Sequence, residues 1–154
     1  MKIVKFLLLV GLVLTLSSLA IAGEAKRTAF ISDRKGTVEV RAADKKWVAA
    51  KTGMILNEGD VIRTMASSWA VLNVDGKGET ATVEVKENSQ LKMAQLLENK
   101  DSSSQSTLLD LALGEVLIKA KKLHSDKSRF EVKTPTSIVA VRGTTFSVAV
   151  EANE

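Results

Sequence analysis

The sequence predicts an all-β domain, and three observations support this. Apolar and polar residues alternate with a period of two in many short runs, which is typical of strands with one buried face. Clusters of Gly, Asp, Asn and Lys separate the runs, as expected of turns. Val, Ile and Thr, which favour strands, are plentiful. Together they predict a rolled or sandwiched arrangement of about ten short, mostly antiparallel strands around a single core.

The alternating runs follow one another along most of the chain. Each places two or three apolar side chains on one face, and we expect these to form the core. They are Val38 and Val40; Ala70, Leu72 and Val74; Ala81, Val83 and Val85; Leu109, Leu111 and Leu113; Val116, Ile118 and Ala120; Phe130 and Val132; and Phe146, Val148 and Val150. The last two strands are expected at residues 136–141 and 145–150, with Arg142 and Gly143 in the bend between them.

One segment fits two structures. "VKENSQLKMAQLLENK" could be a helix with Leu91, Gln95 and Glu98 on successive turns, or a strand with Leu91 and Met93 on one face. We expect a strand from Gln90 to Leu96, followed by an exposed polar loop from Glu98 to Ser106. A weak internal echo, residues 36–38 against 114–116, suggests either two similar β layers or a coincidence.

The first 22 residues have the layout of a secretory signal peptide. Lys2 and Lys5 precede an apolar run from Phe6 to Leu16, and Ala20 and Ala22 form an A-x-A cleavage pattern. The run is short for a membrane-spanning helix, which needs about 20 apolar residues, although an uncleaved anchor is an alternative. We expect an exported mature domain of residues 23–154, in the periplasm or outside the cell, with no transmembrane anchor after cleavage.

Charge and cysteine content narrow the function classes. Removal of Lys2 and Lys5 leaves 20 basic against 18 acidic residues, a net of +2 rather than +4, so nucleic acid is not an expected partner. The chain has no cysteine, so its stability must come from apolar burial and backbone pairing without disulfides.

Several motifs, taken together, resemble the FecR domain. They lie between residues 29 and 150, in a characteristic order and spacing. They are Trp47, Gly53, Leu56, Gly59, Asp60, Thr64, Asp75, Gly76, Thr134, Pro135, Arg142, Gly143, Thr144 and Phe146. The resemblance implies a β fold in an extracytoplasmic setting, with Trp47 closing one end of the core.

The sequence also departs from the regulators for which that family is named. Those proteins carry a cytoplasmic anti-sigma segment and a membrane helix before the domain. Here five residues precede the apolar run, and four follow Val150. We therefore expect a stand-alone exported domain, and the resemblance does not carry over sigma-factor control or iron regulation.

Nothing in the sequence forms a recognisable catalytic, cofactor or metal site. The single histidine, His124, has no cysteine or second histidine to join it, and a solvated turn residue is the simpler interpretation. The oxygen-rich stretches at 57–60 and 75–79 do not match an EF-hand loop and are interpreted as β-turns; weak calcium binding stays open. We expect no enzyme activity and no cofactor.

Two surfaces are candidates for partner contact. Trp69 is out of phase with Leu72 and Val74, so it should face outward, where it could mark an interface or cover a loop. Lys119, Lys121 and Lys122 belong to the most basic segment, which is either a solvated strand end or a contact for an acidic partner. Arg142, beside apolar runs, should be paired because a buried lone charge is costly, and Asp60 is the partner we predict.

These observations favour a non-enzymatic protein-interaction, signalling or scaffold module of the cell envelope. The alternative is a structural envelope protein that binds the cell wall or a polysaccharide. A hydrolase with scattered carboxylates is a third hypothesis, for which the sequence offers no paired acid and base.

Overall fold

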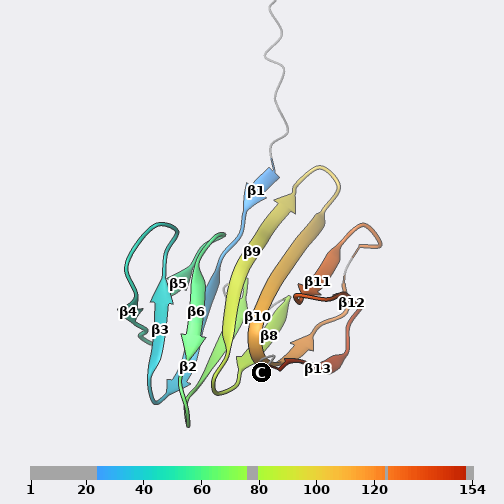
Figure 1. Ribbon diagram of the computed structural model, residues 1–154. Helices are drawn as coiled ribbons and strands as arrows, with labels where there is room; N and C mark the ends of the chain where they lie inside the picture. Colours follow the sequence, from blue (N-terminus) through green and yellow to red (C-terminus); the bar gives the residue numbers. More distant parts are fainter. Residues whose placement is uncertain (1–23, 76–79, 124, 152–154) are drawn as a thin grey trace, which may run out of the picture.

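The computed structural model describes residues 24–75, 80–123 and 125–151, and this part of the chain contains thirteen strands and no helix (Figure 1). The all-β prediction is confirmed. The number of strands exceeds the expected ten because three elements of two or three residues, β1, β4 and β5, are too short to show alternation. The strands are β1 (Glu24–Lys26), β2 (Ala29–Lys35), β3 (Val38–Arg41), β4 (Val48–Ala49), β5 (Ile55–Leu56), β6 (Val61–Thr64), β7 (Trp69–Val74), β8 (Ala81–Val85), β9 (Gln90–Asn99), β10 (Ser104–Ala120), β11 (Arg129–Lys133), β12 (Ile138–Val141) and β13 (Thr145–Val150).

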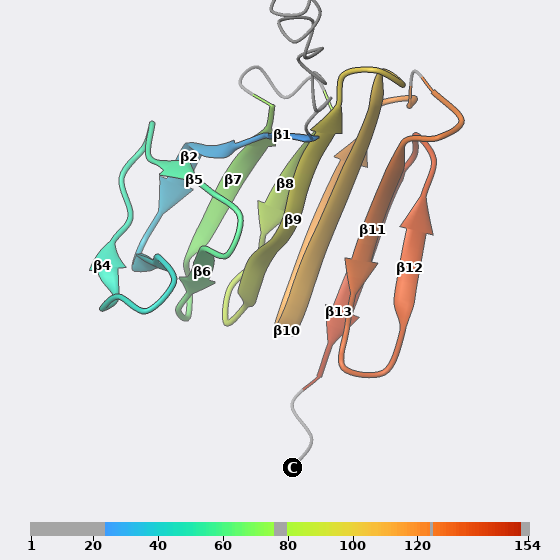
Figure 2. The ribbon, with the colours of Figure 1, turned by 90° about the horizontal axis from the view of Figure 1, so that it is seen from above.

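The strands form two layers that share β10 (Figure 2). In the first sheet the order is β4-β3-β6-β9-β10-β11-β12, and β10 takes part through residues 104–113. In the second sheet the order is β5-β2-β7-β8-β10-β13, and β10 takes part through residues 114–120. All these pairs are antiparallel except β10 with β11.

The core lies between the two sheets, where the inward side chains of both layers meet. One cluster of buried apolar residues joins strands from β2 to β13, as expected of a sandwich with a single core. Ile31, Leu72, Leu91, Leu111 and Phe130 are among the largest of its fully buried side chains. The alternating burial within β7 and β8 confirms the predicted inward faces.

Several crossings between the sheets lie at one end of the sandwich, at the bottom of Figure 1, in a row of similar bends. Gly36 and Gly114 adopt positive φ values of 75° and 88° in two of them. The next N–H in each bend, on Thr37 or Glu115, donates to a serine Oγ of the neighbouring bend, Ser68 or Ser89, at 2.9 Å. The internal echo in the sequence therefore corresponds to a repeated crossing.

The ambiguous segment is a strand, as predicted, but the exposed loop after it is shorter than expected. β9 continues to Asn99 and β10 begins at Ser104, so the turn spans residues 100–103. Cross-strand pairing of Ser106 with Leu97 and of Gln105 with Glu98 extends the sheet through these polar residues. The polar composition of residues 98–106 wrongly predicted a longer loop, because backbone hydrogen bonds, rather than side chains, hold these two strands together.

Candidate functional site

The predicted ion pair between Asp60 and Arg142 is wrong. Asp60 is buried before β6, where its Oδ2 accepts the N–H of Asn57 at 2.8 Å. Arg142 is exposed in the bend between β12 and β13, and it takes part in no ion pair of the described residues. The prediction failed because Arg142 reaches solvent beside its apolar neighbours, which removes the need for a buried counter-charge.

The buried ion pair of the described structure joins Arg27 to Asp75. Arg27 is 7% exposed, and its Nε donates to Asp75 Oδ1 at 2.7 Å. The same guanidinium donates to Thr107 Oγ1 at 3.0 Å and to Thr80 Oγ1 at 3.1 Å. The group therefore connects the segment before β2 with the ends of β7, β8 and β10. From the sequence, Asp75 was expected in a turn and in the FecR motif, and nothing pointed to Arg27 as its partner, because no spacing rule links residues 48 positions apart.

Trp47 does not close the core, which corrects the role that the family resemblance implied. It is half-buried, outside the core cluster, and the guanidinium carbons of Arg63 and Arg41 lie 3.9 Å and 4.8 Å from its ring centroid. Arg63 also pairs with Glu39, Nε to Oε2 at 2.7 Å. These stacked cations favour a structural role for Trp47 on the outer side of the first sheet.

Three further motif residues contact the backbone or the core. Thr64 is buried, and its Oγ1 accepts the N–H of Ser89 at 3.1 Å. The N–H of Gly59, at φ 94°, donates to Met93 O at 2.7 Å. Phe146 packs against the edge of the core. Pro135 is exposed in the turn before β12.

The motif residue Gly76 and the single histidine, His124, lie outside the described residues. In the described part of the chain no group of three or more His, Cys, Asp and Glu is placed to hold a metal ion.

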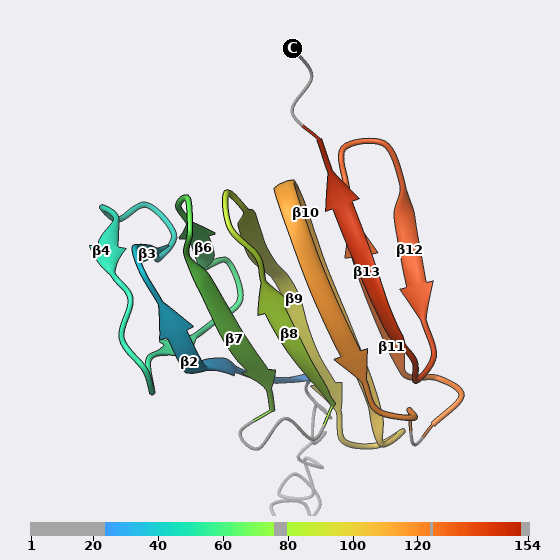
Figure 3. The same cartoon turned by 90° about the horizontal axis from the view of Figure 1, so that it is seen from below.

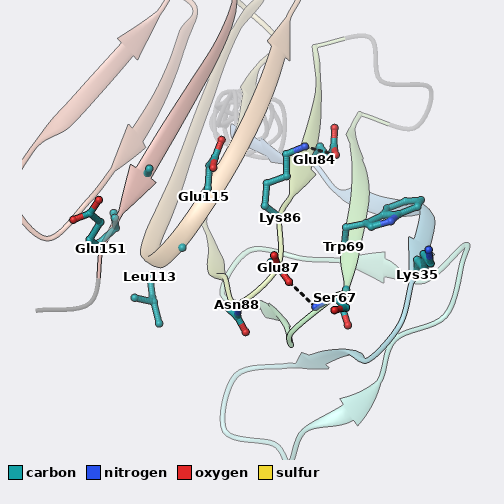
Figure 4. Close-up of a pocket in the computed structure, with 14 residues that line it drawn as sticks. Lys35, Ser67, Trp69, Glu84, Lys86, Glu87, Asn88, Leu113, Glu115 and Glu151 are labelled. Carbon is teal, nitrogen blue, oxygen red and sulfur yellow. Dashed lines mark hydrogen bonds and ion pairs between the residues drawn. The ribbon is translucent and has the colours of Figure 1, made fainter. Parts of the chain in front are cut away.

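Trp69 lies half-exposed on the outer face of the second sheet, as its phase predicted. It stands at one side of a shallow trough of about 910 Å³, and Figure 4 shows it together with the charged residues around the trough. The trough extends over β7, β8, β10 and β13. Its lining residues are Lys35, Ser67, Ser68, Trp69, Glu84, Lys86, Glu87, Asn88, Leu113, Gly114, Glu115, Ala149, Val150 and Glu151.

Carboxylates outnumber ammonium groups in this trough, which we call the Trp69 trough. Lys86 Nζ lies 2.6 Å from Glu84 Oε1, which neutralises one charge of each sign. Glu115 accepts the Ser147 hydroxyl at 2.6 Å, and Glu87 accepts the N–H of Ser67 at 2.6 Å. An aromatic ring beside an acidic, solvent-open surface can stack on a partner side chain and attract basic groups.

In the structure Arg142 lies next to the predicted basic segment of Lys119, Lys121 and Lys122. Lys119, Lys121 and Lys122 are exposed, and the bend that carries Arg142 packs against them, since Ala120 N–H donates to Thr144 O at 3.1 Å. A Cβ on Gly143, at φ 72°, would lie 2.8 Å from the Cα of Lys122. The three lysines and Arg142 thus form one basic cluster, whose members share no ion pair with the described carboxylates.

The family comparison agrees with the motifs. The model described as FecR protein matches residues 60–154, more than half of the chain. The earlier motif residues Trp47, Gly53, Leu56 and Gly59 precede this match. No curated protein and no solved structure matches the chain significantly. The described residues include no helix able to cross a membrane.

Proposed function

Because the chain belongs to the FecR family, we propose that it is a non-enzymatic interaction module of the cell envelope that docks on another envelope protein. Its family is associated with the envelope. The signal-like residues 1–22 support export to the periplasm or beyond. The non-enzymatic assignment rests on a sequence with one histidine, no cysteine and no recognisable nucleophile motif.

The Trp69 trough carries the proposal. A half-exposed tryptophan outside the core is the type of residue that contributes most to protein interfaces. It lies on the regular part of the second sheet, paired with Lys35 of β2, so the surface needs little ordering when a partner binds. The excess of carboxylates favours a partner surface that carries Lys or Arg.

Site-specific cross-linking in intact cells tests this function. A photo-cross-linking amino acid at Lys35, which lines the trough next to Trp69, should capture a discrete partner. Trp69→Ala should abolish the capture, whereas Trp47→Ala, which removes the other half-buried tryptophan from the opposite sheet, should leave it unchanged. Capture that survives Trp69→Ala, in a protein that both substitutions leave folded, would contradict the role of the trough.

The basic cluster favours a second function, binding of an anionic cell-wall polymer. Four cations on a strand end and the adjacent bend give a local positive surface, and such a surface attracts polyanions in a salt-dependent way. The test is co-sedimentation of the protein with purified cell wall. Reversal of Lys119, Lys121 and Lys122 to Glu should release the protein, while the control reversal of the exposed Lys45 and Lys46 should not. Equal sedimentation of both variants would remove this function.

A further inference from the structure

The two sheets end differently at the edge formed by the last three strands. Beyond β10 the first sheet continues with β11 and β12, whereas the second sheet continues only with β13. Figure 2 and Figure 3, seen from opposite sides, show β13 against β11 and β12 lying farther out. In the described structure no strand of the second sheet faces β12. The sandwich is therefore one strand short at this place.

A groove of about 730 Å³ lies at one end of that place, and it is bordered by Ala112 and Leu113 of β10, the turn of residues 134–137, Val139, and residues 147–151. Val139 of β12 borders it on one side, and Val148 and Val150 of β13 border it on the other. These three residues face the interior, in phase with the buried Val141 and opposite to the exposed Ala140 and Ala149. The groove therefore leads to the apolar layer between the sheets, and an occupant would need aliphatic side chains on its inward face.

The β13 edge is open to further pairing. Among the described strands β13 is paired only with β10, and its six residues carry no charge and no proline. Edge strands are usually protected by charges, proline or very short length. The opposite edge of the sandwich shows such protection, because β4 and β5 have two residues each. The β13 edge therefore lacks the features that usually prevent a further strand from joining a sheet.

We propose that this groove accepts one extended strand of a partner protein, which pairs with β13 and completes the second sheet beneath β12. Main-chain hydrogen bonds would provide affinity, and alternate aliphatic residues packing on Val139, Val148 and Val150 would provide specificity. Arg142 lies in the bend before β13 and Glu151 follows its other end. A strand antiparallel to β13 would suit these charges with a basic residue at its start and an acidic residue at its end.

A second copy of the chain does not fit this place. If β13 paired with β13 of another copy, the second copy's β11, which faces its own β13, would have to occupy the position that β12 of the first copy already fills (Figure 3). The occupant must therefore be a strand with no facing strand of its own, such as a tail or a linker. The groove adjoins the Trp69 trough at residues 149–151, but the inference does not rest on docking through Trp69.

A fused strand tests the proposal without knowledge of the partner. The last three residues are replaced by Asn-Gly-Thr-Val-Thr-Val-Thr-Val, so that a two-residue turn after Glu151 returns the strand along β13 with valines facing inward. The matched control, Asn-Gly-Val-Thr-Val-Thr-Val-Thr, has the same composition with every side chain on the other face. The first extension should raise the melting temperature by several degrees relative to the control. Equal melting temperatures would overturn the proposal.

A free peptide then tests binding in the unextended protein. The probe Lys-Thr-Val-Thr-Val-Thr-Val-Glu should bind, and Val139→Lys should weaken its binding about tenfold or more. Ile138→Lys, on the exposed face of the same strand, and Trp69→Ala should leave binding unchanged, which separates this groove from the Trp69 trough. Binding that is absent, or insensitive to Val139→Lys, contradicts the proposal. A dimer that dissociates on Val139→Lys would identify a second copy as the occupant and overturn it as well.

Discussion

Removal of the charge of Asp75 should be one of the most damaging conservative changes in this protein. Asp75→Asn keeps the shape of the side chain and suits the positive φ of 64° at this position. It leaves the guanidinium of Arg27 buried, with hydroxyl and carbonyl acceptors but no counter-charge. Breaking a buried ion pair from one side costs about 3–5 kcal/mol.

The structure places the expected cost at the lower end of that range. The Asp75 side chain is 17% exposed, so water can partly replace its charge. A loss of about 3 kcal/mol corresponds to a fall of roughly 6–12 °C in melting temperature for a chain of this size. Calorimetry or urea unfolding measures the change directly.

Two comparisons decide whether burial of the charge is the cause. Glu39→Gln breaks the pair between Glu39 and Arg63, whose side chains are 27% and 32% exposed respectively. This change should lower the free energy of unfolding by less than about 1 kcal/mol. In the double variant Arg27→Met with Asp75→Asn no charge is left unpaired, so the loss should be smaller than the sum of the single losses. If Asp75→Asn destabilises the protein no more than Glu39→Gln, the reasoning is refuted.

Other substitutions compare the contribution of the bends to stability with that of an exposed side chain. Arg142→Ala should change the free energy of unfolding by less than about 0.5 kcal/mol because Arg142 is exposed, and a larger loss by chemical denaturation would revive an ionic role. Gly143→Ala should cost about 1–2 kcal/mol or more in the same assay, because φ is 72° and the new Cβ would lie 2.8 Å from Lys122 Cα. Ser89→Ala should cost about 1–3 kcal/mol, since it leaves the N–H of Glu115 without its acceptor; unchanged amide exchange at Glu115 would contradict this.

Alternation predicted the strands well wherever a run was long enough to have two distinct faces. β7 and β8 bury Ala70, Leu72, Val83 and Val85 completely, as their period of two required. β4 and β5 could not be found in this way, because two residues show no period. Their pairing with β3 and β2 depends on where the neighbouring strands lie, which local sequence does not reveal.

Side-chain partners far apart in the sequence were the least predictable feature. Arg142 was assigned to Asp60 by the logic that a charge beside apolar runs must be neutralised. That logic was sound for a buried charge and applies to Arg27, which meets Asp75 from 48 positions away. Burial has to be known before the rule can be applied, and alternation does not give the burial of residues between strands. The role of Trp47, which was taken from the family resemblance, was wrong, and its neighbours Arg41 and Arg63 could not be foreseen because they come from separate strands.

The open groove follows from the order of the last connections rather than from any local motif. After β10 the chain returns to the first sheet at the end opposite the serine-lined bends, so β11 runs parallel to β10. β12 then adds a second strand to that sheet, and only β13 goes back to the second one. The crossing from β12 to β13 consists of Arg142, Gly143 and Thr144. It packs on the backbone of Lys122, so these three residues set the position of β13 relative to β12. We therefore expect this bend, which carries part of the FecR motif, to influence the distance between β12 and β13, and Gly143→Ala should weaken binding of the strand peptide even where the protein remains folded.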